Sequence, residues 1–100
     1  MGRNAEADPR LLTAIQQKRL IELRYDGKVR VAEPHDYGMQ KGQQKLLSYQ
    51  LEPVTNWRLF EIEKMSDLRV LERSFRGGRP TSSGQHHKWD RLFARVGSSK

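Results

Sequence analysis

The chain has 100 residues, with 19 Lys and Arg against 12 Asp and Glu, which gives a formal net charge of +7 at pH 7. A chain of this length forms one small domain with a modest core, so two lobes around a catalytic cleft are excluded. It holds no cysteine, which excludes disulfides, thiolate metal sites and thiol nucleophiles and favours a cytoplasmic protein.

Membrane insertion is not expected. Residues 1–8 lack the apolar central region of a signal peptide, and no apolar run reaches the roughly 18 residues that span a bilayer. We expect residues 1–8 to be disordered.

The positive charge is concentrated near the C-terminus. Residues 1–72 carry 12 Lys and Arg against 11 Asp and Glu, whereas residues 73–100 carry 7 Lys and Arg and only Asp90 as an acid. This asymmetry predicts a nearly neutral body followed by a basic element that can meet a polyanion. A solvated tail would show the same charge.

The chain is predicted to begin with a short helix. Asp8-Pro9 opens it, because aspartate caps free amide groups and proline fits the first helical position. Leu11, Leu12 and Ile15 then share one helix face.

A β-hairpin follows the helix. Apolar and polar residues alternate from residue 20 to a turn at Asp26-Gly27, and again over residues 28–31. Glu33-Pro34 should end this pairing or place it at a sheet edge, because proline has no amide proton.

Three more strands are predicted at residues 45–51, 57–63 and 68–72, with a tight turn over residues 64–67. Phe60 and Ile62 would share one face of the fourth strand. Five short strands without crossover helices predict an antiparallel sheet curled into a small barrel.

The C-terminal quarter predicts a linker and a second helix. Residues 76–84 are rich in Gly, Pro and Ser. Within residues 85–100, an apolar stripe with helical spacing predicts an amphipathic helix ended by Gly97; its members are Trp89, Leu92, Phe93 and Val96. This helix must pack on the barrel or on a partner.

No catalytic constellation stands out, so we expect neither an enzyme nor a cofactor. His86 and His87 are adjacent and point in different directions, and His35 lies far from them in sequence, which argues against a metal site. His35-Asp36 is interpreted as a pair that fixes the turn after Pro34, or as hydrogen-bonding groups at a groove rim.

Several segments, in this order, resemble the WYL domain, a small SH3-like or Sm-like β-barrel usually attached to bacterial transcription regulators. The resembling segments are residues 11–19, 21–25, 31–34 with Tyr37, 45–49 after Gly42, 58–62 with Met65, and 68–71. The Trp-Tyr-Leu tripeptide that names the family falls on Gln44, Lys45 and Leu46, so only the leucine is kept.

The chain is more similar to short, free-standing members of this family. They share Glu33-Pro34-His35, Tyr37-Gly38, Leu46-Leu47 and the strand that begins Trp57-Arg58-Leu59-Phe60. The resemblance implies a mainly β fold with flanking helices, in which a five-stranded antiparallel barrel and its leading helix occupy residues 9–75. It also implies a ligand-sensing module without chemistry of its own, which in some members binds nucleic acid or nucleotides.

The resemblance nominates a groove at Lys45 and Arg58, with His35, Tyr37 and Tyr49 near it. Lysine and arginine would pair with phosphate, and tyrosine or Trp57 would stack on a base. Arg58 shares the face of Phe60 and Trp57 takes the other, so either of the two could reach a ligand. Tyr49 and Trp57 could instead belong to the core and its cap.

Arg73, Arg76 and Arg79 form a second basic feature. Such arginines contact phosphates without reading sequence, so the binding should weaken with salt. The same segment could instead be a turn that returns the C-terminal helix to the barrel.

The leading hypothesis is a non-catalytic module that binds nucleic acid or a nucleotide-like anion. The alternative is a protein-interaction subunit that forms a homodimer or docks on a partner through Trp89, Leu92 and Phe93. Peripheral binding to an anionic membrane would use the same basic helix, but the stripe is short for that purpose.

Overall fold

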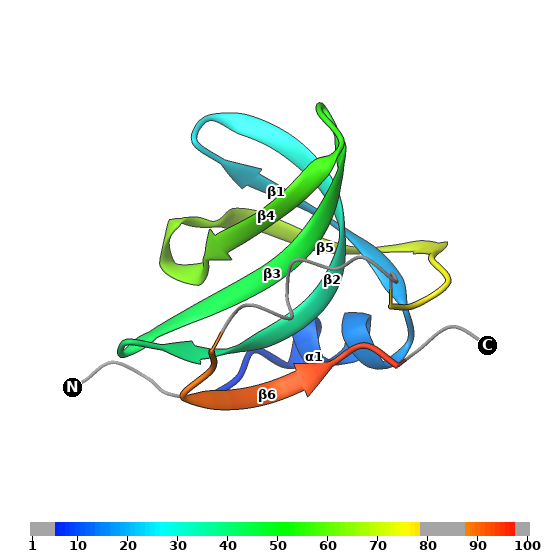
Figure 1. Cartoon of the computed structure of the whole chain (residues 1–100). Coiled ribbons are helices and arrows are strands. Elements are labelled where there is room, and N and C mark those ends of the chain that lie inside the picture. The colour runs from blue at the N-terminus through cyan, green and yellow to red at the C-terminus, as the bar shows by residue number, and fades with distance from the viewer. Residues whose placement is uncertain (1–5, 79–87, 98–100) are drawn as a thin grey trace.

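The computed structural model describes residues 6–78 and 88–97 (Figure 1). In chain order the elements are α1 (Pro9–Gln16), β1 (Arg19–Tyr25), β2 (Lys28–Gln40), β3 (Gln43–Glu52), β4 (Asn56–Glu61), the short 3-10 helix η1 (Ile62–Lys64), β5 (Ser66–Ser74) and β6 (Arg91–Arg95). No helix among the described residues is long and apolar enough to cross a membrane.

The six strands form one antiparallel sheet in the order β4-β3-β2-β1-β5, with β6 added to β2. The long strand β2 pairs with three of the other strands, β1, β3 and β6. Residues 28–32 pair with β1, residues 36–39 pair with β6, and β3 pairs along the other edge of β2. The hairpin pairing of β1 with β2 ends before Glu33-Pro34, as expected, because Ile21 and Ala32 are its last pair, but β2 itself continues along β3. Pro34 lies within β2 opposite Ser48, and a register shift follows it before Asp36.

The predicted closed barrel is also wrong, because the sheet is open and β4 and β5 are its ends. Side chains take two of the amide groups of β4. The amide of Trp57 donates to Oδ1 of Asn56 at 2.8 Å, and the amide of Glu61 donates to the hydroxyl of Tyr25 at 3.1 Å. Capping of this kind protects an edge strand without a further strand.

The N-terminal helix is present as α1. Asp8 caps it, since Oδ1 accepts a hydrogen bond from the amide of Arg10 at 2.9 Å. The helix buries Leu11, Ala14 and Ile15 against the sheet. These side chains join the hydrophobic core, whose strand residues include Ile21, Leu23, Tyr25, Ala32, Tyr37, Leu46 and Phe60.

The predicted C-terminal amphipathic helix is wrong, because Arg91–Arg95 forms strand β6. The second half of β2 offers β6 a free edge, and Gly38 permits close approach: a Cβ there would lie 2.2 Å from the carbonyl oxygen of Arg91. The ring of Phe93 packs edge-on against Tyr37, with centroids 5.0 Å apart. Strand pairing and these contacts outweigh the helical spacing of the apolar residues.

Candidate ligand-binding face

Four rings gather beside β2, β3 and β4, and we call them the aromatic cluster: His35, Tyr49, Trp57 and Phe75. The ring centroids of His35 and Trp57 lie 4.9 Å apart, those of Tyr49 and Trp57 5.2 Å, and those of His35 and Phe75 5.5 Å. Tyr49 and Trp57 are half-buried. The rings therefore pack on one another, while His35 is buried and the other three keep some accessible surface.

Strand register explains how these rings meet. Tyr49 on β3 lies directly opposite Trp57 on β4. Side chains alternate between the two faces of a strand, so Lys45 and Leu47 point to the same side as Tyr49. We call this side the outer face. The register shift between Pro34 and Asp36 inserts His35 into β2 as an extra residue and brings its ring to Trp57.

Polar and charged side chains next to the rings hold the outer face in place. His35 is only 3% exposed, and its Nε2 lies 3.1 Å from Oε1 of Glu33, which is 5% exposed. Both oxygens of Asp36 accept hydrogen bonds from the guanidinium of Arg95, at 3.1 and 3.2 Å. Because such charge-assisted bonds are directional, they fix the strand positions on either side of His35.

The backbone of β6 adds to this support. The amide of Val96, just beyond β6, donates to the carbonyl oxygen of His35 at 2.8 Å. Together with the Asp36–Arg95 pair, this bond ties the C-terminal strand to the bulge that carries His35. The position of the candidate ligand-binding rings thus depends on β6.

The sequence-predicted residues divide between the two faces of the sheet. The structure brings His35, Tyr49 and Trp57 together, and it places Lys45 on the same face opposite Glu61. Arg58 lies on the other side of β4, with its guanidinium carbon 5.9 Å from the centre of the Phe60 ring. Arg58 is therefore not part of the aromatic cluster.

Tyr37 is also separate from the cluster, because it is fully buried in the core. Its hydroxyl donates to Oε1 of Gln44 and accepts from the amide of Asp8 at 2.8 Å. Burial raises the pKa of Tyr37 above its usual value, so the hydroxyl remains protonated. These contacts give Tyr37 a structural role.

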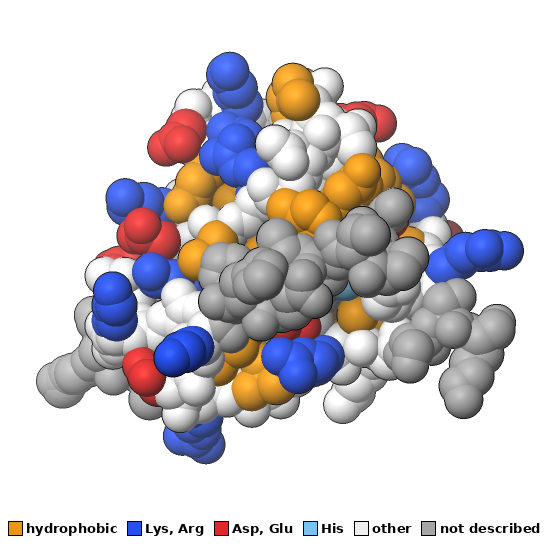
Figure 2. Space-filling view, in the orientation of Figure 1, with side chains coloured by type: hydrophobic (Ala, Val, Ile, Leu, Met, Phe, Trp, Pro, Cys, Tyr) orange, Lys and Arg blue, Asp and Glu red, His pale blue; other side chains and the backbone are white. Residues whose placement is uncertain are grey.

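The basic residues near Phe75 are accessible. Arg73 and Arg76 are exposed and flank Phe75, whose amide donates to the carbonyl oxygen of Lys18 at 2.8 Å. Arg79 lies outside the described residues, as do His86 and His87. Figure 2 shows Lys and Arg side chains spread around the rim of the visible face, with apolar side chains between them.

No sequence pattern assigned Phe75, Glu33 or the Asp36–Arg95 pair to this region. Phe75 carried a signal, since it is an isolated aromatic residue between two arginines at the end of a strand. The reading of His35-Asp36 as a turn or rim pair is corrected, because both residues are buried on β2. Within residues 6–78 and 88–97, no group of three or more His, Asp or Glu side chains could hold a metal ion.

Comparison with solved structures bears on the fold. No protein-family model matches the sequence, and no curated protein matches it. Among solved structures, it is similar to proteasome accessory factor B/C (PafBC) of Arthrobacter aurescens, with a TM-score of 0.66 and 22% identity. The match covers 77% of this chain and only 13% of that one. At this identity the match supports the fold alone, which is WYL-like.

Proposed function

We propose that this chain is a non-catalytic, cytoplasmic regulatory module of the WYL type, a short free-standing member, whose outer face binds nucleic acid or a nucleotide-like anion. The observation that carries the proposal is the contact between Tyr49 and Trp57, whose half-buried rings pack edge to face on one side of the sheet. Aromatic rings on a sheet stack on bases regardless of sequence, whereas basic side chains hold the phosphates.

Charge and fold lend further support. Lys45 lies on the same face. Two exposed arginines lie next to Phe75 in sequence: Arg73 near the end of β5, and Arg76 just beyond it. The WYL-like fold that the chain shares with PafBC is consistent with a regulatory, ligand-binding module. An anionic ligand with a planar group would stack on the rings while its negative charge pairs with the basic side chains.

The test is a titration of a fluorescein-labelled single-stranded oligonucleotide with the full chain, followed by anisotropy at low and moderate salt. We expect binding that weakens as salt rises, and Trp57→Ala should weaken it roughly fivefold or more, because one stacked base contributes about 1–3 kcal/mol. Val54→Ala is the matched control, since Val54 is an exposed apolar residue in the loop before β4.

Arg58→Gln separates the two faces. Arg58 lies beside Phe60 on the core side of β4, so we expect this variant to retain most of the oligonucleotide affinity. Loss of binding in Arg58→Gln with normal binding in Trp57→Ala would move the site to the opposite face. No binding by the parent protein at either salt concentration would overturn the proposal.

The alternative of docking through the C-terminal stripe loses its main support in the structure. Phe93 packs against Tyr37, and Val96 is 8% exposed in the core. Of the stripe, only Leu92 is substantially exposed. One exposed leucine is normal for a protein surface and does not define an interface.

A further inference from the structure

Strand β4 ends the sheet on one side and turns a row of backbone groups outward. Its only strand neighbour among the described residues is β3 (Figure 1). The amides of Trp57 and Glu61 donate to side chains, so they point away from β3. Because backbone groups alternate in direction along a strand, the amide of Leu59 points the same way. We call residues 57, 59 and 61 the β4 edge.

Side chains cap the β4 edge symmetrically about Leu59. Two residues before it, the amide of Trp57 is taken by Oδ1 of Asn56 at 2.8 Å. Two residues after it, the amide of Glu61 is taken by the hydroxyl of Tyr25 at 3.1 Å. No side chain within residues 6–78 and 88–97 bonds to the amide of Leu59. The middle of the edge is therefore open, and only its two ends are capped.

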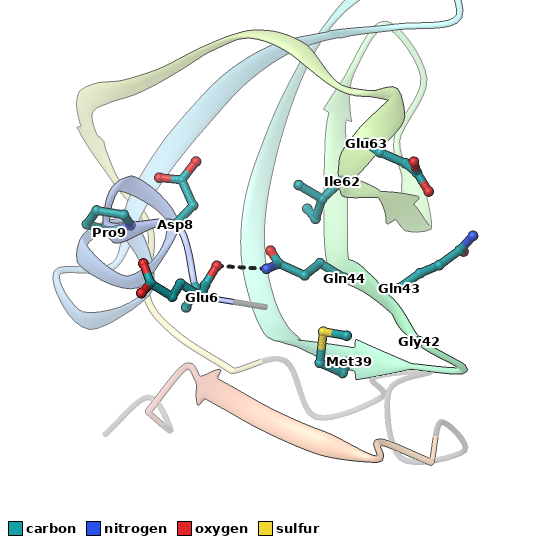
Figure 3. A pocket seen from close by; sticks show the side chains of 10 residues that line it. Glu6, Asp8, Pro9, Met39, Gly42, Gln43, Gln44, Ile62 and Glu63 are labelled. Carbon is teal, nitrogen blue, oxygen red and sulfur yellow. Dashed lines mark hydrogen bonds between the residues drawn. The ribbon is translucent and has the colours of Figure 1, made fainter. Parts of the chain in front are cut away.

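The cap at the far end comes from a distant strand. Tyr25 belongs to β1, and its ring packs edge-on against Phe60 at 4.8 Å, which brings its hydroxyl to the amide of Glu61. The edge stops there because the chain turns into η1, where Ile62 points toward the segment before α1 and Glu63 points away from it (Figure 3). Tyr25 thus closes the end of the edge that borders η1.

The β4 edge is complementary to itself. If β4 of a second copy lay antiparallel about a two-fold axis at Leu59, each Trp57 would face Glu61 of the other copy. Residues 57, 59 and 61 would then form consecutive hydrogen-bonded pairs, in which every outward amide meets an outward carbonyl oxygen. The half-buried side chains of Leu59 would meet at the axis. A two-fold axis uses the same surface on both copies, so this pairing stops at a dimer.

We propose that the β4 edge is a strand-addition site for a second copy of this chain, kept closed in the monomer by Asn56 and Tyr25. Pairing requires these two side chains to release the amides that they cap. The inference does not rest on the proposed function, because it uses the backbone of β4 and not the rings. A dimer of this kind would join two outer faces in one continuous sheet.

The test compares self-association of the parent and the double variant Asn56→Ala/Tyr25→Phe by sedimentation equilibrium. This uncapped variant loses both caps but keeps the ring that packs on Phe60. We expect it to dimerise about tenfold more tightly than the parent. Asn56→Ala alone changes an exposed side chain, so it should fold and show a smaller increase. Association no tighter than that of the parent, in variants that circular dichroism shows to be folded, would overturn the inference.

Leu59→Lys locates the interface. On the uncapped background, two lysines would face each other across the axis, so we expect association to return to the level of the parent. Val54→Lys adds the same charge in the exposed loop between β3 and β4 and should leave the dimer intact. In the dimer, the amide of Leu59 should exchange hydrogen more slowly. Association that Leu59→Lys does not weaken, or species larger than a dimer, would contradict two-fold pairing at this edge.

The two proposals can fail separately. The oligonucleotide titration uses the parent, which we expect to be monomeric, so its result does not depend on pairing of the β4 edge. Oligonucleotide binding by the parent together with a monomeric uncapped variant would overturn only this inference. Dimerisation of the uncapped variant without oligonucleotide binding by the parent would overturn only the proposed function.

Discussion

The two faces of β3 and β4 carry similar residue types in different surroundings. On the core face, Leu46 and Phe60 are completely buried, and Phe60 packs edge-on against Tyr25 at 4.8 Å. On the outer face, Tyr49 and Trp57 pack on each other at 5.2 Å but remain half-buried. Whether an aromatic residue of β3 or β4 is structural or accessible to a ligand therefore depends on the face of the sheet that it occupies, and not on its type.

The buried polar groups differ between the faces as well. On the core face, the guanidinium of Arg30 bonds to neutral acceptors, with Nη1 donating to Oε1 of Gln50 at 3.0 Å. On the outer face, charged side chains meet each other, as in the contact between Asp36 and Arg95. On the core face, hydrogen bonds satisfy a buried polar side chain. On the outer face, an ion pair joins β6 to the strand that bears His35.

The largest expected difference between the faces is in stability. Phe60→Ala should lower the free energy of unfolding by about 3–5 kcal/mol, because it removes a fully buried ring from the core. Leu59→Ala, one residue earlier and half-buried on the outer face, should cost less than about 2 kcal/mol. Urea denaturation followed by circular dichroism measures both. Equal losses would show that the outer face is part of the core.

A substitution at Gly38 should affect both faces through β6. The added Cβ of Gly38→Ala would meet the backbone oxygen of Arg91 at 2.2 Å, and backbone yields less readily than a side-chain end. We expect a loss of about 1–3 kcal/mol and faster hydrogen exchange at Ala94 and Val96. Gly97→Ala is the control, since among the described residues its Cβ would meet only Lys18, at 3.9 Å. Unchanged exchange in Gly38→Ala would mean that β6 can shift without losing its pairing.

Local patterns predicted the first half of the fold well. Asp8-Pro9 opens α1, and Asp26-Gly27 joins β1 to β2, because capping and turn formation involve only neighbouring residues. The C-terminal stripe could not be assigned in the same way. Its spacing suits a helix, but its structure depends on an edge of β2 and on the missing side chain of Gly38, which are distant in sequence. Whether the sheet closes into a barrel also depends on strand edges that are distant in sequence.

The candidate site was predictable only where the strands are regular. Alternation along β4 correctly separates Trp57 from Arg58, since no register shift interrupts the β3–β4 pairing. Strict alternation would also place His35 and Tyr37 on one face of β2. The shift between Pro34 and Asp36 separates them, leaving His35 near Trp57 and Tyr37 in the core. A bulge of this kind has no reliable signature in the sequence.

Tyr37→Phe tests whether this core-side tyrosine is purely structural. The variant keeps the ring but removes the hydroxyl that contacts Gln44 and the amide of Asp8. We expect a loss of about 1–2 kcal/mol in urea denaturation, because two polar partners lose a hydrogen bond. Oligonucleotide affinity should stay within about twofold of the parent when the variant is folded. A large loss of affinity would instead link the core face to ligand binding.

The smallest expected effect comes from Arg10, which lies outside the aromatic cluster. Its hydrogen bonds to the Asp8 carboxylate lower the pKa of Asp8 below its usual 3.8. A lowered pKa means that the ionised Asp8 stabilises the folded state above about pH 3.8, and that this contribution is lost as the pH falls through the lower folded value. Because Arg10 is largely exposed, we expect Arg10→Ala to cost only about 0.3–1 kcal/mol at pH 7.

This difference between the parent and Arg10→Ala should shrink as Asp8 is protonated, which urea denaturation at a series of pH values from 7 to about 2 would measure. Asp8→Asn is the matched control, because asparagine still caps the helix but carries no charge, so a second change of Arg10→Ala on that background should have almost no effect. Arg10 also reaches the carbonyl oxygen of Leu68, at 3.4 Å. A difference that persists at low pH would therefore assign the stabilisation to this contact with β5 instead of to Asp8.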